Sequence, residues 1–153
     1  MTHGALYSHF QSKDALTAEA TKRTFDDCLR DFAGSNASEF LRRYLSAQHR
    51  DNPEEGCPTA ALVSEVSRQP AKSQAVFRNG VDRFIALAGE SLEASGAEHD
   101  NDRAVLMFAA MVGGLALSRA IRKIDEPASA DILRAVGDQL RLLLAVPAKR
   151  PRK

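Results

Sequence analysis

The sequence predicts an all-α fold. Apolar residues recur at helical spacing along almost the whole chain, whereas the alternation typical of strands is nearly absent. The interruptions fall at glycine, asparagine and proline, which end or restart helices. With 153 residues, of which 44% are hydrophobic, the chain has enough apolar material for one domain with a buried core.

The front of the chain divides into three expected helices. The first covers residues 13–32, with Ser12 as its N-cap and with Leu16, Phe25, Cys28, Leu29 and Phe32 facing inward. A break at 34–36 precedes a second helix, which we expect Ser38 to cap. After a loop over 51–56, a shorter helix follows Pro58, because proline is favoured in a first helical turn.

Three longer helices are expected in the second half, over about 70–94, 102–123 and 130–146. The first of them carries the stripe Phe77, Val81, Phe84, Ile85, Ala88 and Leu92. The last carries the stripe Ile132, Leu133, Val136, Leu140, Leu143 and Leu144. The longest apolar run, 104–117, is shorter than the roughly 20 residues that span a bilayer, so it predicts a buried helix.

Composition excludes few partners and favours no catalytic chemistry. The net charge of +1 argues neither for nor against nucleic acid. Cys28 and Cys57 form no metal-ligand spacing, nothing in the sequence brings them together, and their small number is consistent with a reducing cytoplasm. No phosphate loop, zinc motif or nucleophile elbow occurs, and no signal peptide is visible. We expect no enzyme, cofactor or metal.

The first sixteen residues carry the most specific pattern. Thr2 is suited to cap a short helix, and Gly4 allows a close backbone approach. Leu6 and Phe10, four apart, share one helical face. The segment matches a known pattern at nine positions. The pattern is a small or hydroxyl residue, then Gly-Ala-Leu-Tyr, His-Phe, Lys and Leu, with variable residues between them. The nine matching residues are Thr2, Gly4, Ala5, Leu6, Tyr7, His9, Phe10, Lys13 and Leu16.

This segment resembles the end of the DNA-binding domain of TetR/AcrR-family transcriptional regulators. The resemblance implies an all-α C-terminal ligand-binding and dimerisation domain of TetR type behind a partial helix-turn-helix. Residues 1–12 would be the remnant of the recognition helix, 13–147 the helical domain, and 148–153 a basic disordered tail. Because the family places two further helices before this segment, we expect Met1 to be an internal methionine or the edge of a fragment.

The resemblance also assigns DNA contacts. Tyr7, His9 and Lys13 match positions that contact the phosphate backbone. Thr2, His3 and Gly4 lie where the family reads or approaches bases. In full-length form the partner would be double-stranded operator DNA. For this chain alone we expect weak DNA binding and poor anchoring of residues 1–12, since a recognition helix needs its partner helix to hold it at the groove.

Two small residues interrupt the apolar helix over 102–123, and this favours close packing against another helix. In TetR-like regulators the last two helices of two subunits pair, and these segments look similar. The predicted homodimer interface consists of Gly113, Gly114, Leu117, Leu133, Val136, Leu140 and Leu144. The alternative is that both helices bury their apolar faces within one monomer.

A ligand pocket is expected between the central helices. Its candidate residues are His49, Cys57, Phe77, Phe84, Met107, Phe108 and Met111. Aromatic and methionine side chains suit an adaptable apolar cavity, but they suit a plain core equally well. His49 and Cys57 are interpreted as ligand contacts or a redox-sensing thiol, or else as a surface histidine and a structural cysteine.

These observations together favour a ligand-responsive transcriptional regulator of the cytoplasm. The resemblance implies a repressor that an unidentified small molecule releases from its operator, by shifting the population of recognition-helix spacings. The alternative is a stand-alone helical module that binds a small molecule and dimerises without binding DNA.

Overall fold

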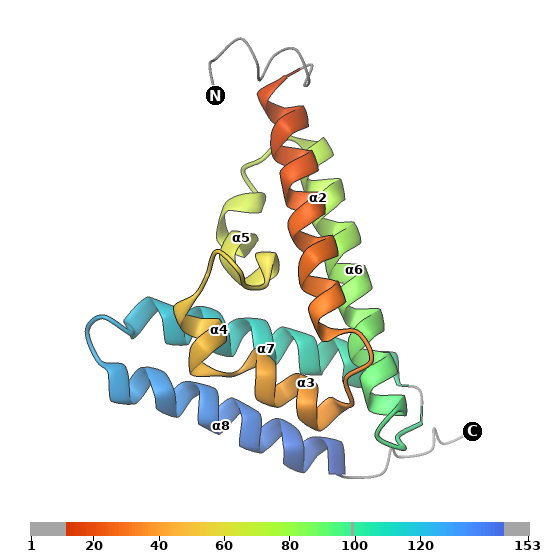
Figure 1. Ribbon diagram of the computed structural model, residues 1–153, viewed down its shortest axis with the longest axis vertical. Coiled ribbons are helices and arrows are strands. Elements are labelled where there is room, and N and C mark those ends of the chain that lie inside the picture. Colours follow the sequence, from red (N-terminus) through yellow and green to blue (C-terminus); the bar gives the residue numbers. More distant parts are fainter. Residues whose placement is uncertain (1–11, 99, 146–153) are drawn as a thin grey trace.

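The computed structural model describes residues 12–98 and 100–145, and all regular elements in these ranges are α-helices (Figure 1). They are α2 (Lys13–Phe32), α3 (Ala37–Tyr44), α4 (Ala47–Asp51), α5 (Pro58–Val66), α6 (Ala71–Glu93), α7 (Asn101–Ile121) and α8 (Glu126–Ala145). The predicted all-α fold is confirmed. The residues proposed to contact bases and all but one of those proposed to contact phosphates, 2–9, lie outside the described part of the chain.

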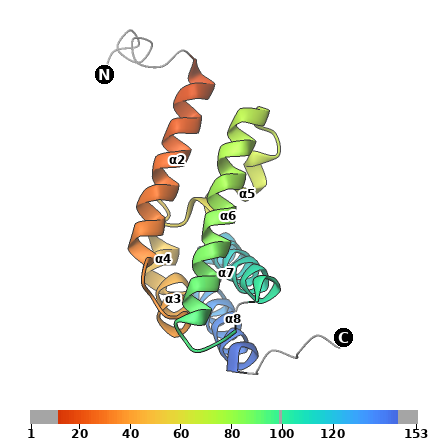
Figure 2. The same ribbon diagram turned by 90° about the vertical axis from the view of Figure 1, so that its right-hand side faces the viewer.

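Two helix pairs cross to form the frame. The long helices α2 and α6 run side by side in the same direction, as both ribbon views show (Figures 1 and 2). Below them α7 and α8 form an antiparallel pair. The short helices α3, α4 and α5 lie between the two pairs, so they connect the end of α2 to the face of α7.

Helix starts are set by side-chain caps. Ser12 accepts from the Ala15 amide at 3.1 Å, which confirms the predicted start of α2. The cap of α3 is Asn36 rather than Ser38, because the Asn36 side chain accepts from the Glu39 amide at 3.0 Å. The helix therefore begins before Ser38.

Two boundaries differ from the expectation. The sequence predicted one helix up to the loop at residue 51, whereas α3 ends at Tyr44 and α4 begins at Ala47. The new start is set by Ser46, which accepts from the His49 amide at 3.1 Å and donates to the Arg43 carbonyl at 2.8 Å. The last helix begins at Glu126 rather than at residue 130. Pro127 stands in its first turn, where the missing N–H is not needed, so this proline starts the helix instead of ending the connection.

An aromatic core fills the junction of α2, α3, α6 and α7. Phe84 and Phe108 stack with ring centroids 5.1 Å apart, and Phe84 also contacts Phe25. A side chain at Gly80 would place its Cβ 2.4 Å from the Phe25 ring, so glycine allows α6 to approach α2. The predicted inward residues of α2 are confirmed from Phe25 to Phe32, whereas Leu143, in the predicted apolar stripe of α8, is 51% exposed.

Candidate functional site

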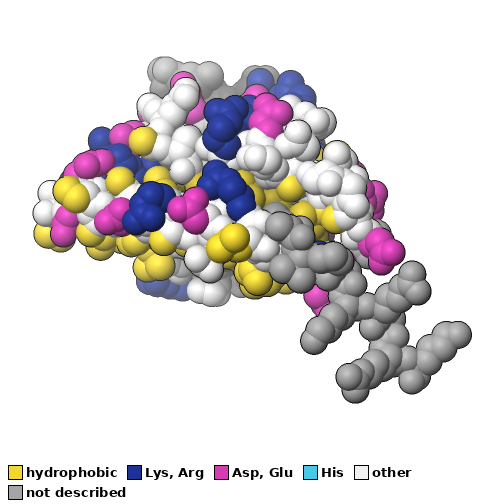
Figure 3. Space-filling view, turned by 90° about the horizontal axis from the view of Figure 1, so that it is seen from below, with side chains coloured by type: hydrophobic (Ala, Val, Ile, Leu, Met, Phe, Trp, Pro, Cys, Tyr) yellow, Lys and Arg dark blue, Asp and Glu magenta, His cyan; other side chains and the backbone are white. Residues whose placement is uncertain are grey.

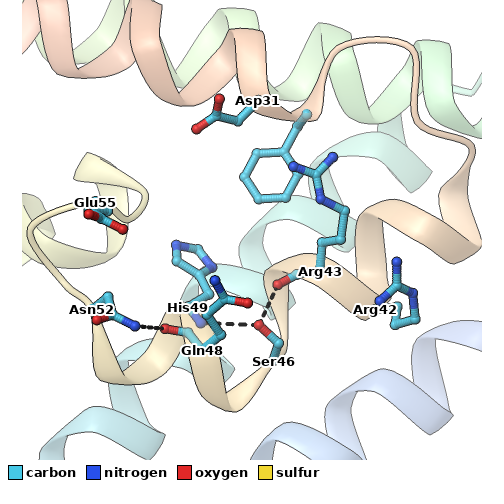
Figure 4. A pocket seen from close by; sticks show the side chains of 9 residues that line it. Asp31, Arg42, Arg43, Ser46, Gln48, His49, Asn52 and Glu55 are labelled. Atoms are coloured by element: carbon cyan, nitrogen blue, oxygen red, sulfur yellow. Dashed lines mark hydrogen bonds between the residues drawn. The ribbon is translucent and has the colours of Figure 1, made fainter.

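A pocket of about 240 Å³ opens between the end of α2, helices α3 and α4, and the loop that follows (Figure 4). Its lining is mixed in charge and mostly polar. It consists of Asp31, Phe32, Arg42, Arg43, Ser46, Gln48, His49, Asn52 and Glu55. The Arg43 guanidinium lies 4.9 Å from the centre of the Phe32 ring, which holds both side chains in the wall.

His49 forms the inner wall of this pocket and is fixed at both ring nitrogens. Its Nδ1 lies 2.7 Å from the Tyr44 carbonyl oxygen, and its Nε2 lies 2.8 Å from the Cys57 backbone nitrogen. An amide N–H only donates, so Nε2 is the acceptor and Nδ1 carries the proton. Burial lowers the pKa of His49, and the nearby Arg119 cation lowers it further against the opposing Tyr44 carbonyl. The ring is therefore a neutral imidazole.

Behind His49 lies a group of buried polar side chains, which we call the Cys57 cluster: Cys28, Tyr44, Cys57, Thr59 and Arg119. The members come from α2, α3, the start of α5 and α7. Each of the two thiols shifts the pKa of the other, although they are far apart in sequence. No pattern in the sequence indicated this interaction, because it depends on the packing of α2 against α5.

Three buried polar atoms of the cluster lack partners. The Tyr44 hydroxyl, the Thr59 hydroxyl and Arg119 Nη1 make no well-formed hydrogen bond within the described residues. Both hydroxyls lower the pKa of Cys57. Buried polar groups in folded proteins are nearly always paired, and an unpaired one costs about 1–3 kcal/mol. Three such atoms within one group of side chains distinguish it from the apolar core.

The surroundings of Cys57 favour its thiolate. Burial raises the pKa of Cys57, but Cys28, the Tyr44 and Thr59 hydroxyls and the Ala60 amide outweigh it and lower the pKa to about 6. The hydrogen bond to Cys57 and burial both raise the pKa of Cys28. The two shifts are opposite in direction, so the surroundings favour the thiolate at Cys57 and the thiol at Cys28.

Arg119 and Arg50 connect the cluster to the lower helix pair. Arg119 Nε donates to the Arg50 carbonyl at 3.1 Å, and its Nη2 donates to the His49 carbonyl at 2.6 Å. Arg50 is only 4% exposed and donates to Glu126 and Ser129 of α8 at 3.1 and 3.0 Å. The roles of both arginines were not predictable from the sequence, because they depend on how α4 packs against α7 and α8.

The structure separates the predicted pocket residues into two sets. His49 and Cys57 lie together, one lining the pocket and the other directly behind it. The remaining candidates pack in the core, fully or partly buried, and line neither this pocket nor a neighbouring one between α2 and α6. They are Phe77, Phe84, Met107, Phe108 and Met111. For these five the plain-core alternative describes their placement.

Some of the predicted dimer residues are exposed, whereas others are buried within the chain's own core. Gly113 faces open space and Leu117 is 61% exposed. Gly114 packs on Val136 of the same chain, where an added Cβ would lie 3.1 Å from a methyl group. Leu133 and Leu140 are buried in the chain's own core. The side chain of Leu144 lies outside the described part of the structure.

Exposed hydrophobic side chains nevertheless gather on this lower end of the molecule, as Figure 3 shows from below. The largest exposed fractions on α7, α8 and the turn between them belong to Leu106, Leu117, Ile124, Leu142 and Leu143. α7 is long and apolar enough to cross a membrane by length and composition, and 44% of that stretch is buried inside the chain, a combination that core helices of soluble proteins also show.

Lys13, the described member of the predicted DNA contacts, is exposed at the first residue of α2. Within residues 12–98 and 100–145, no three His, Cys, Asp or Glu side chains are grouped so that they could hold a metal ion.

No family model matches the chain, and no curated protein matches it. Among solved structures, the crystal structure of the reduced form of NemR from E. coli is similar to it. The TM-score is 0.77 at 20% sequence identity, and the match covers 97% of this chain and 83% of NemR. At this identity the likeness shows a shared fold.

Proposed function

We propose that this chain is the effector-binding and dimerisation part of a cytoplasmic transcriptional regulator of TetR/AcrR type, a repressor released from operator DNA by a small molecule. One observation carries the proposal. α2 begins at Lys13, inside the segment that resembles the recognition helix and its successor, and its far end walls the pocket through Asp31 and Phe32. The fold shared with NemR supports it, and nothing in the site favours catalysis.

Helix α2 could transmit the effect of a bound small molecule from the pocket to the N-terminal end of the helix. α2 has 20 residues and is therefore about 30 Å long. An effector that prefers one position of Phe32 and His49 would tilt α2, and the tilt would move whatever precedes Lys13. Because Arg119 and Arg50 join the same site to α7 and α8, the effector would also bias the spacing between two subunits.

The proposed homodimer uses the outer face of α7. Leu106, Gly113 and Leu117 recur at spacings of seven and four residues, so they share one helical face, and Gly113 leaves room for a second helix. We expect Leu117→Arg to convert the protein to a monomer in sedimentation equilibrium. Val63→Arg, at another exposed apolar position on α5, should leave the mass unchanged; a monomeric wild-type protein would contradict the proposal.

DNA binding is tested with the full protein as its gene encodes it. Duplexes selected from a random library would be measured by fluorescence anisotropy at several salt concentrations. We expect Lys13→Ala to weaken binding to all sequences alike and to reduce the salt slope by roughly 1, the loss of one phosphate contact. Lys123→Ala, which removes the same charge after the end of α7, is the matched control and should change neither quantity.

Two results would overturn the assignment. Wild-type protein that binds no duplex selectively would favour a stand-alone helical binding module. An affinity loss on Lys13→Ala that is confined to the selected sequence would contradict the phosphate role of this residue.

A further inference from the structure

We propose that the groove between α2 and the first half of α6 binds a small amphiphilic anion, a free molecule with an apolar body and one carboxylate group. This groove is separate from the pocket beside His49, because the two share no lining residue. The proposal concerns binding of this anion alone, so it holds or fails independently of whether the protein binds DNA.

The groove runs along one face of α6. Its residues on this helix recur at spacings of three and four, so they share that face. They are Lys72, Ala75, Val76, Asn79, Gly80 and Arg83. Lys22 and Phe25 of α2 form the opposite wall. The volume is about 350 Å³, against about 240 Å³ for the pocket beside His49. Small-molecule sites commonly have volumes of about 300–1,000 Å³, so the groove is large enough for one such ligand.

The floor of the groove is apolar and fixed. At Gly80 the two helices come close, since an added Cβ would lie 2.4 Å from the Phe25 ring. Toward the start of α6, Ala75 carries only a methyl group and leaves space open. The Phe25 ring is held by ring contacts with Phe77 at 5.7 Å and with Phe84 at 6.1 Å. Phe25 therefore stays in the core and does not turn to fill the space itself.

The charged side chains that line the groove, Lys22, Lys72 and Arg83, are all cationic. Asp26, outside the lining, pairs with Lys22 at 3.2 Å and with Arg83 at 2.5 Å, which fixes these two cations beside the groove. Lys72 makes no hydrogen bond or ion pair within residues 12–98 and 100–145. Three cations against one carboxylate leave an excess of positive charge, so the groove favours an anion.

The floor and the cations together select an amphiphilic anion. Phe25, Ala75 and Val76 would contact an alkyl or aromatic body, and the alkyl stems of the lysines would extend this apolar wall. Lys72 would pair with the carboxylate from the first turn of α6, where the helix dipole also favours negative charge. A sugar would leave the apolar floor unused, and a cationic amphiphile would meet like charges.

The test titrates the protein with decanoate, below the concentration at which it forms micelles, and follows the backbone amides by nuclear magnetic resonance. We expect saturable shifts that are largest at Ala75, Val76, Asn79 and Gly80. Decanol and decyltrimethylammonium keep the alkyl chain but lack the negative charge. Both should bind at least about fivefold more weakly, the loss expected for one partly exposed ion pair.

Two pairs of variants separate the groove from the rest of the surface. Ala75→Trp fills the groove and should abolish the shifts, whereas Ala20→Trp, at an exposed alanine of α2 outside the lining, should leave them unchanged. Lys72→Glu should weaken decanoate binding about fivefold or more. Lys123→Glu, which reverses the same charge after the end of α7, should not. Circular dichroism checks that each variant keeps the helical fold.

Three results would contradict the proposal. The first is the absence of saturable decanoate binding. The second is equal affinity for decanoate and decanol, which would mean that the cations select nothing. The third is a set of shifts confined to the exposed hydrophobic side chains of α7 and α8, such as Leu117 and Leu142, or to the surroundings of His49.

Discussion

Two buried regions of this molecule lie next to each other and differ in chemistry: one is an aromatic core, and the other holds buried polar atoms without hydrogen-bond partners among the described residues. In the aromatic core, Phe84 is fully buried and makes ring contacts with Phe25 and Phe108. In the Cys57 cluster, Tyr44 is just as deeply buried, but its hydroxyl has no well-formed partner. Burial alone therefore does not distinguish the core from the site. The two regions differ in whether their buried polar atoms have hydrogen-bond partners.

The largest expected effect lies in the aromatic core. Phe84→Ala removes a fully buried ring and leaves a cavity, so the free energy of unfolding should fall by about 3–5 kcal/mol in urea denaturation. Leu142→Ala, at a side chain that is 63% exposed, is the control and should change stability by less than about 0.5 kcal/mol. Equal losses in the two variants would mean that the stacked rings do not carry the core.

In the Cys57 cluster, removing a buried group should change the free energy of unfolding in the opposite direction. Tyr44→Phe keeps the ring and its contacts but removes a hydroxyl that is buried without a good partner. The free energy of unfolding should stay equal or rise by up to about 1–3 kcal/mol, the cost of an unpaired polar group.

The matched control for Tyr44→Phe is Ser118→Ala. This hydroxyl is equally buried but exchanges hydrogen bonds of 2.8 Å with Ser129, so its removal should destabilise the protein by about 1 kcal/mol. If both variants lost stability, the Tyr44 hydroxyl would have a partner in solution and the contrast between the two regions would disappear.

The sequence predicted the aromatic core better than the cluster, and for a physical reason. Periodicity reports which face of a helix is buried, and it placed Phe25, Phe84 and Leu133 correctly. The same signal made Phe84 and Phe108 look like pocket residues, since a cavity wall and a packed core share one composition. His49 and Cys57 were found because a histidine near a helix end and a cysteine at a helix start stand out chemically.

The cluster as a whole was beyond reach of the sequence. Apart from Thr59, which follows Cys57 closely in the sequence, its other members come from α2, α3 and α7, and contacts between distant helices leave no local pattern. Arg119 lies in the last turn of α7, where a basic residue is ordinarily read as a helix-end charge. The break between α3 and α4 was missed, because a two-residue interruption is too short for helical periodicity to show it.

The smallest expected effect is a pH dependence that separates His49 from Cys57. Burial holds the pKa of His49 below its ordinary value of 6.5, so between these two values the unfolded chain binds more protons than the folded one. The stability that neutral His49 contributes is complete above about pH 6.5 and is lost as the pH falls below it. The pKa of Cys57 is lowered from 9.0 to about 6 in the folded chain. The stability that the Cys57 thiolate contributes is therefore lost as the pH falls from about 9 to about 6, a higher range than that of His49.

Melting temperatures between pH 8.5 and 5 resolve the two groups. His49→Gln keeps an acceptor for the Cys57 amide and a donor for the Tyr44 carbonyl without titrating, so its melting temperature should fall less than that of wild type below about pH 6.5. Cys57→Ser should flatten the curve above pH 6 instead. Asp26 and Asp51, whose pKa values arginines lower, are unchanged in both variants and cancel in the comparison. Identical curves for wild type and His49→Gln would show that the imidazole is not held neutral, and the inner wall of the pocket would then carry a charge.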